Sequence, residues 1–139
     1  MKLQTYWIMK HIKNLLVPKY LLAIAILYSL FITVISLLPI EDFPKVNYTF
    51  ADKIAHISIH ALLFLFWAIF FFIKDSFKLN RKTLVLIIGG CLIYGIIIEI
   101  LQGVFTDYRD ADLFDLIANI IGLSLGLILF LTVKKISNV

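Results

Sequence analysis

Cysteine is almost absent from this sequence, since Cys91 is the single one among 139 residues. One thiol cannot form an intrachain disulfide, and every metal motif built on two or more cysteines is excluded. Because Cys91 lies within an apolar run, we interpret it as a small buried hydrophobic side chain. A glycine-rich phosphate loop is also missing, and Ser58 is a lone hydroxyl, so the sequence gives little indication of nucleotide binding or acyl transfer.

Charged residues are scarce as well. They make up 16% of the chain, whereas 62% is hydrophobic and the mean hydropathy is +1.00. A soluble domain is about half apolar and a quarter charged, so this composition predicts an integral membrane protein with one domain over residues 1–139. The net charge of +4 does not indicate nucleic-acid binding, because Lys and Arg set the orientation of membrane proteins.

Four long apolar runs, at about 19–38, 52–73, 83–102 and 112–133, predict four transmembrane helices. About 20 residues at roughly 1.5 Å per residue cross a hydrocarbon layer of about 30 Å. Residues 1–18 carry lysines and apolar side chains at helical spacing, which predicts a short amphipathic helix on the membrane surface. A disordered tail is the alternative for this segment. The expected fold is an all-α membrane protein, a four-transmembrane-helix bundle.

The distribution of basic residues predicts the orientation of this bundle. Ten of the thirteen lie in the N-terminal segment, in the link 74–82 or at the C-terminus, and eight of the nine acids lie on the other side. The positive-inside rule then places both termini in the cytoplasm. We expect a multi-pass protein of the bacterial cytoplasmic membrane.

With this topology, the polar residues of three predicted spans gather at one depth, at the extracytoplasmic face. Acids and amides inside membrane-length segments are costly and normally face one another or a water-filled cavity. We therefore predict one outward-facing polar pocket built from ten residues: Asp52, Lys53, His56, His60, Glu99, Gln102, Arg109, Asp112, Asp115 and Asn119.

Simpler explanations exist for several of these residues. Asp52 begins one predicted helix and Asp110 or Asp112 begins another, and an acid at such a position caps free N–H groups. Lys53 could instead reach the lipid head groups, and Asn119 could only link two helices. Glu99 is harder to explain, because it lies toward the end of a helix, where the dipole disfavours an acid.

Glu99 is therefore expected to pair with His56, Lys53 or Arg109, either in a purely structural ion pair or in a functional site. His56 with Asp52 or Asp115 could form a proton-transfer pair.

Metal binding is a further alternative. His56 and His60 share a helix face, and with Glu99 or Asp115 they would offer nitrogen and oxygen ligands of the zinc type. The glutamate that accompanies such a pair in H-E-x-x-H motifs is absent, however. We expect no metal and no cofactor.

The residues, in this order, resemble the VanZ-like family of small bacterial membrane proteins. The resemblance covers about residues 52–126 and rests on four pieces: Asp52-Lys53-x-x-His56, Glu99-x-x-Gln102, Arg109, and Asp115-x-x-x-Asn119-x-x-Gly122. It implies a four-helix membrane protein, and the founding member of the family is associated with low-level resistance to the glycopeptide teicoplanin. His60 departs from the family pattern, which more often has an aromatic residue there.

Three functions are consistent with such a pocket. The first is a non-enzymatic protein that binds a membrane lipid, a lipid-linked cell-wall precursor or a glycopeptide, with Lys53 and Arg109 holding phosphate or carboxylate. The second is an intramembrane enzyme that acts on a lipid head group, with His56, Glu99 and Asp115 as catalytic candidates. The third is an oligomeric proton-coupled transporter or channel.

Glycines are expected to bring helices into close contact. Gly122 and Gly126 form a small-xxx-small motif that could also join two copies of the chain, and Gly89 with Gly90 would permit a close helix approach in the third span.

Overall fold

The computed structural model describes residues 18–38, 48–105 and 112–136. These residues form four α-helices and no strand: α2 (Pro18–Leu37), α3 (Tyr48–Lys74), α4 (Arg81–Phe105) and α5 (Leu113–Ile136). Each helix is long and apolar enough to cross a membrane, judged by its length and composition. The prediction of four all-α spans is thereby confirmed. The expected interfacial helix falls on residues 1–17, which lie outside the described residues.

Helices α3, α4 and α5 are longer than the hydropathy pattern predicts, whereas α2 has the predicted length. Helix α3 begins at Tyr48, so Asp52 lies in its second turn and does not open the helix, which corrects the expected capping role. Helix α4 continues to Phe105, so Glu99 also lies farther inside its helix than expected. The hydropathy pattern marks the length in contact with hydrocarbon, whereas a helix satisfies its own backbone hydrogen bonds and can continue into the interface.

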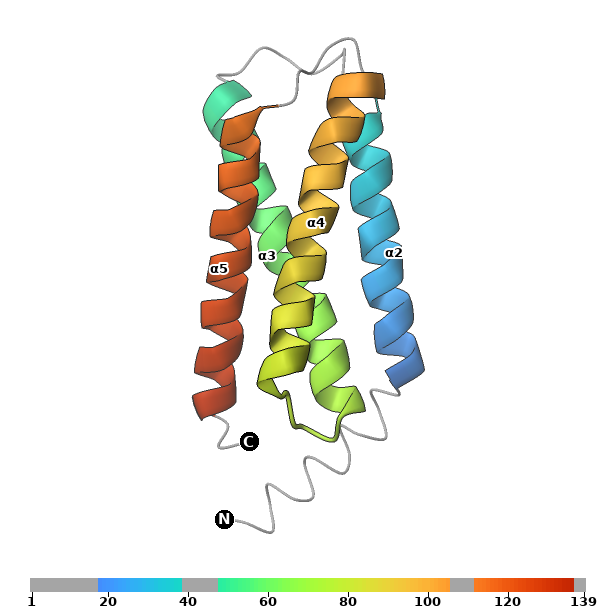
Figure 1. Cartoon of the computed structure of the whole chain (residues 1–139), viewed down its shortest axis with the longest axis vertical. Helices are drawn as coiled ribbons and strands as arrows, with labels where there is room; N and C mark the ends of the chain where they lie inside the picture. Colours follow the sequence, from blue (N-terminus) through green and yellow to red (C-terminus); the bar gives the residue numbers. More distant parts are fainter. Residues whose placement is uncertain (1–17, 39–47, 106–111, 137–139) are drawn as a thin grey trace.

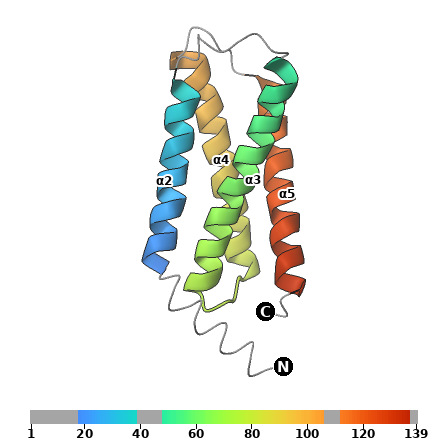
Figure 2. The same ribbon diagram turned by 180° about the vertical axis from the view of Figure 1, so that it is seen from behind.

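The four helices run alternately up and down, with α3 and α4 lying between α2 and α5 (Figures 1 and 2). The start of α2, the end of α3, the start of α4 and the end of α5 share one end of the bundle, which we call the basic end. Its cations are Lys19, Lys74, Lys78, Arg81, Lys82, Lys134 and Lys135. The opposite end, where α3 and α5 begin and α4 finishes, is called the acidic end.

The interior of the bundle below the acidic end is hydrocarbon. Phe64 is fully buried, and its ring meets Phe130 edge-on at 6.5 Å between centroids. Leu63 and Ala68 of α3 are buried in the same region, and Cys91 of α4 packs among them as expected. Because lipid tails are as apolar as these side chains, shape complementarity has to stabilise the contacts between the helices.

Helix α3 runs diagonally through the bundle, so that its first half lies against α5 (Figure 1). Gly122 and Gly126 of α5 make this contact close. A Cβ atom at Gly126 would lie 2.8 Å from the Ala61 carbonyl oxygen, and one at Gly122 would press on the Ile57 carbonyl. The glycine surface that was expected to receive a second copy of the chain is therefore covered by α3.

Gly89 and Gly90 play a different part from the one expected. A Cβ atom at either position would meet nothing within 4 Å, so neither glycine mediates a close helix contact. Gly90 instead borders an apolar cavity of about 390 Å³ between α2, α3 and α4, which none of the charged residues lines. The other residues around this cavity are Ser29, Leu63, Trp67, Phe71, Leu86, Ile87, Cys91 and Tyr94.

The two glycine pairs give a matched test of the packing. Gly126→Ala should destabilise the protein by about 1–3 kcal/mol, because the added methyl forces α5 away from the α3 backbone. Gly89→Ala should leave stability unchanged or raise it by up to about 1 kcal/mol, since alanine favours helix and space is available. Thermal unfolding in detergent measures both variants. Equal stability of the two would contradict the close α3–α5 contact.

Candidate functional site

Seven of the polar residues predicted from the sequence come together at the acidic end. Asp52, Lys53 and His56 come from α3 and Glu99 from α4. Asp112 immediately precedes α5, while Asp115 and Asn119 lie within it. We call this set of seven the polar cluster. Its members are linked by hydrogen bonds and ion pairs between helices, as the shared depth of the spans predicts.

Lys53 connects α3 to the start of α5. Its ammonium group donates hydrogen bonds to Asp112 Oδ2 at 2.7 Å and to Asp115 Oδ1, and it lies 3.6 Å from Asp52 Oδ2. The side chain is only 21% exposed. Lys53 therefore points into the cluster, and the alternative in which it reaches for lipid head groups is wrong.

His56 lies at the centre of the cluster, and its two ring nitrogens have different surroundings. Nδ1 lies 3.0 Å from Asn119 Oδ1. The Asn119 amide nitrogen donates to Glu99 Oε1 at 3.4 Å, so the amide oxygen is the atom that faces His56. The Nδ1–H group consequently donates to the Asn119 oxygen. Glu99 Oε1 lies 3.6 Å from the same Nδ1 atom, so Glu99 and His56 are close enough for the predicted ion pair.

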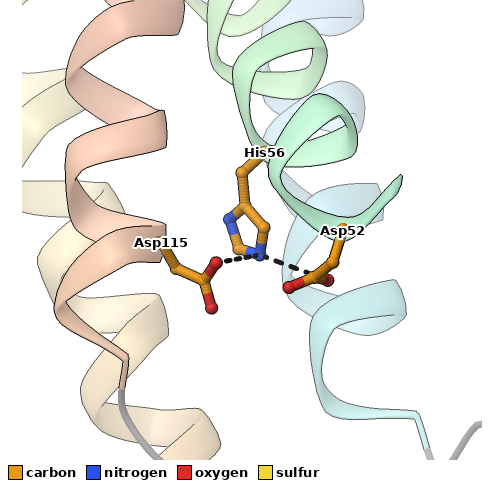
Figure 3. Close-up of side chains that lie close together, drawn as sticks. All are labelled: Asp52, His56 and Asp115. Carbon is orange, nitrogen blue, oxygen red and sulfur yellow. Dashed lines mark ion pairs between the residues drawn. The ribbon is translucent and has the colours of Figure 1, made fainter. Parts of the chain in front are cut away.

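The other ring nitrogen of His56 faces two carboxylates. Figure 3 shows the ring between Asp52 and Asp115, with Nε2 3.8 Å from Asp52 Oδ1 and 3.7 Å from Asp115 Oδ1. Both distances exceed those of hydrogen bonds. His56 is 8% exposed and Asp115 6%, so these groups meet largely shielded from solvent. Both proton-transfer partners considered for His56 are thus adjacent to it.

His60 lies one turn below His56, on the same face of α3. Its Nδ1–H donates to the His56 carbonyl oxygen at 3.2 Å, and the two rings are nearly parallel with centroids 6.4 Å apart. Its Nε2 atom makes no hydrogen bond within the described part of the chain. Gly95 of α4 makes room for this ring, since a Cβ atom there would lie 3.0 Å from Nε2. Spacing alone gave no indication of the role of Gly95.

Gln102, a further member of the predicted pocket, also contacts α2. Although it is buried on the same α4 face as Glu99, its amide donates to the Ser36 carbonyl oxygen of α2 at 3.0 Å. Its role in this contact is to join α4 to α2, a helix that the predicted pocket did not include. Arg109, the remaining predicted member, lies outside the described residues.

Hydroxyl groups join α2 to the rest of the bundle, a contact that was not predicted from the sequence. Tyr94 donates to the Ser29 carbonyl oxygen at 2.6 Å, and its hydroxyl lies 2.9 Å from the Thr33 hydroxyl. Tyr28 donates to the Ile59 carbonyl oxygen at 3.2 Å. The available signal was the presence of Tyr, Ser and Thr within otherwise apolar spans, where hydroxyls form interhelical hydrogen bonds.

The weak expectation for acyl transfer overlooked a G-x-S-x-G pattern, Gly122-Leu123-Ser124-Leu125-Gly126, which has Ser124 at its centre. In α/β-hydrolases this pattern forms a sharp strand-to-helix turn that exposes the nucleophile. Here the stretch lies in the middle of α5, and the Ser124 hydroxyl donates to the Ile120 carbonyl oxygen at 2.8 Å. Ser124 is therefore not positioned as the nucleophile of such a motif.

Asp112 combines two roles at the start of α5. Its Oδ1 accepts a hydrogen bond from the Phe114 N–H at 2.8 Å, which confirms the helix cap expected there. Its Oδ2 accepts from Lys53. The hydrogen bond from Lys53, followed by that from the Phe114 backbone, holds the pKa of the Asp112 carboxyl below its ordinary value.

The polar cluster carries more negative than positive charge. It contains four carboxyl groups, whereas Lys53 and His56 are the basic side chains among the described residues that face them. Asp52, His56 and Asp115 each offer one ligand atom within 4.8 Å of the others, so they could hold a metal ion. This set differs from the His56–His60 pair considered from the sequence, because His60 faces Gly95.

Comparison of the chain with known proteins gives no match among family models, curated proteins or solved structures. The chemistry of the site therefore has to be argued from its own residues.

Lys53→Met tests the ion-pair network. The variant should lose about 1–3 kcal/mol of stability at neutral pH, because the buried Asp115 loses its cation. The pKa of Asp112 is lowered in the folded protein, so its ionised carboxylate stabilises the fold at pH values above the ordinary pKa of aspartate. This contribution is lost as the pH falls through the lowered pKa of Asp112. The stability curves of wild type and variant should thus converge in acid. Lys78→Met, at the basic end, is the control, and parallel curves for Lys53→Met would count against the network.

Proposed function

We propose that this chain is a VanZ-like protein of the bacterial cytoplasmic membrane, with both termini in the cytoplasm and the polar cluster facing outward. The distribution of charge supports this orientation. The described cations outside the cluster all lie at the basic end, and the carboxyl groups of the cluster lie at the other. The positive-inside rule assigns the basic end to the cytoplasm.

Cysteine labelling tests this orientation. In a Cys91→Ala background, Ala51→Cys at the acidic end should react with a membrane-impermeant maleimide in intact cells. Lys78→Cys at the basic end should react only after the membrane is permeabilised. Both positions are exposed, so accessibility of the side chain does not limit the reaction. The reverse pattern would place the polar cluster in the cytoplasm and rule out an outward-facing pocket.

We further propose that the polar cluster binds the head group of an envelope lipid or lipid-linked cell-wall precursor. The observation that carries this proposal is the burial of several ionisable groups from three spans around His56. Such groups are costly in a membrane and mark sites of function more often than sites of simple packing. Nearby, the end of α4 and the start of α5 expose large apolar side chains that could contact lipid tails: Val104, Phe105, Leu113 and Phe114.

A link to glycopeptide resistance rests on the family resemblance alone. It enters the proposal because an outward pocket that holds a lipid-linked precursor would change the access of teicoplanin to that precursor. Comparing drug susceptibility with and without the gene, and with His56→Ala, tests this part of the proposal separately.

An intramembrane enzyme is the second candidate function, and the setting of His56 favours it. The ring lies between Asp52 and Asp115 and is oriented by Asn119, an arrangement suited to moving a proton to or from a bound head group. Turnover of a lipid head group by the purified protein, lost in His56→Ala while lipid binding persists, would identify the enzyme.

The described interior of the bundle offers few groups for a proton path through a single chain. Beyond His60, the core toward the basic end contains mainly hydrocarbon side chains such as Leu63, Phe64 and Phe130, which cannot relay a proton, together with the Cys91 thiol. The Tyr94 hydroxyl packs against this core and bonds the α2 backbone.

Recovery of bound lipid tests the binding function. The full chain purified from bacterial membranes in mild detergent should carry a phosphate-bearing lipid, detected by native mass spectrometry. Glu99→Gln keeps the shape of its side chain but removes the charge that pairs with His56, so the ring loses a partner that holds it in position, and we expect at least a roughly tenfold loss of bound lipid. Ser124→Ala, an exposed position on α5, is the control. Equal lipid recovery from folded Glu99→Gln and from wild type would contradict a head-group site at the cluster.

A further inference from the structure

We propose that Asp52, His56 and Asp115 form a binding site for one divalent transition-metal ion, with Zn²⁺ as the first candidate. This inference goes beyond the proposed function and rests on it in one respect: the ion would supply the positive charge that a phosphate-bearing head group needs. The three side chains come from α3 and α5 and lie together at the acidic end of the bundle (Figure 3).

The spacing of the three side chains is the first argument. The Nε2 atom of His56 lies 3.8 Å from Asp52 Oδ1 and 3.7 Å from Asp115 Oδ1. These separations are too long for hydrogen bonds. Ligand atoms that lie about 2.0–2.2 Å from a shared zinc ion are roughly 3–4 Å from one another, which the two distances from His56 match, and all three ligand atoms lie within 4.8 Å of one another.

The orientation of the His56 ring is a second and independent argument. Because Asn119 presents its amide oxygen, Nδ1 carries a proton and donates it to that oxygen. Nε2 then faces the Asp52 and Asp115 oxygens at 3.8 and 3.7 Å without a hydrogen bond to either, which is where a metal ligand would have to point. Metal-binding histidines commonly donate their second ring N–H to an oxygen that fixes the ring, as Asn119 does here.

The charge of the surroundings is the third argument. Four carboxyl groups gather in the cluster, and the Lys53 ammonium is already in contact with three of them. A phosphate would therefore have to compete with these carboxylates for the lysine charge. A divalent ion removes this obstacle, and three protein ligands leave a coordination position open for an oxygen of the head group.

Lys53 is a competitor of the ion, because it bonds the same Asp115 oxygen that lies nearest to His56 Nε2. With a metal present, Lys53 can keep its bond to Asp112. Replacing Lys53 with methionine should therefore tighten metal binding, although it lowers the stability of the metal-free protein. If Asp115 had only a structural role, Lys53→Met would lower stability without tightening metal binding.

Metal titration of the full chain tests the site. Protein purified in detergent and treated with a chelator should bind one equivalent of Zn²⁺ by calorimetry, and Co²⁺ should give visible absorption bands from nitrogen and oxygen coordination. His56→Ala and the near-isosteric Asp115→Asn should each weaken binding at least about tenfold. Asn119→Leu should weaken it about 10–100-fold through loss of the bond that orients the ring. Asp75→Asn, at the basic end, is the control and should bind as wild type does.

The outcomes separate the site from its alternatives. No stoichiometric binding by wild type, or equal binding by wild type and the folded Asp115→Asn variant, overturns the proposal. Thermal unfolding confirms that each variant is folded before it is titrated.

The metal site and the lipid site can fail independently. Stoichiometric metal binding without any bound lipid supports the metal site and overturns the proposed function. Lipid that stays bound after complete removal of metal overturns the role of the ion and leaves the lipid function standing. Lipid lost with the chelator and restored by Zn²⁺ supports both.

Discussion

The ammonium group of Lys53 holds the acidic end of the bundle together. It reaches from α3 to two carboxylates at the start of α5, Asp112 and Asp115, and lies near a third, Asp52. Carboxylates brought this close would repel one another, and Asp115 is buried, so water screens its charge little. The ion pair therefore decides how α3 and α5 meet, and the His56 site depends on that arrangement.

The close contact below the cluster makes this ion pair possible. Gly122 and Gly126 let the α5 backbone lie directly against Ile57 and Ala61 of α3, so the side chains one and two turns above are within hydrogen-bonding reach. Packing and electrostatics are thus coupled along one pair of helices. The other two helices are tied in differently, α4 by Glu99 and α2 by Gln102 and the tyrosine hydroxyls.

The polar cluster is asymmetric in a way that bears on its ligand. Its carboxyl groups outnumber its bases among the described residues, and its single lysine is already occupied. A site of this kind favours cations, or anionic ligands that arrive with a cation. Its neighbour, the apolar cavity between α2, α3 and α4, contains none of these charges, so the two features serve different chemistry. The polar site lies at the acidic end of the bundle, whereas the cavity is lined mainly by apolar side chains.

The sequence by itself determined the number of spans and the gathering of Asp52, Lys53, His56, Glu99, Asp115 and Asn119, because hydrophobic length fixes the helices and the cost of burying charge forces these residues together. It did not determine the partners. Tertiary structure alone directed Lys53 inward, turned Gln102 toward α2 and placed Gly122 against α3. Helical periodicity gives the face of each residue, whereas the diagonal course of α3 and the close approach of particular backbones decide which faces meet.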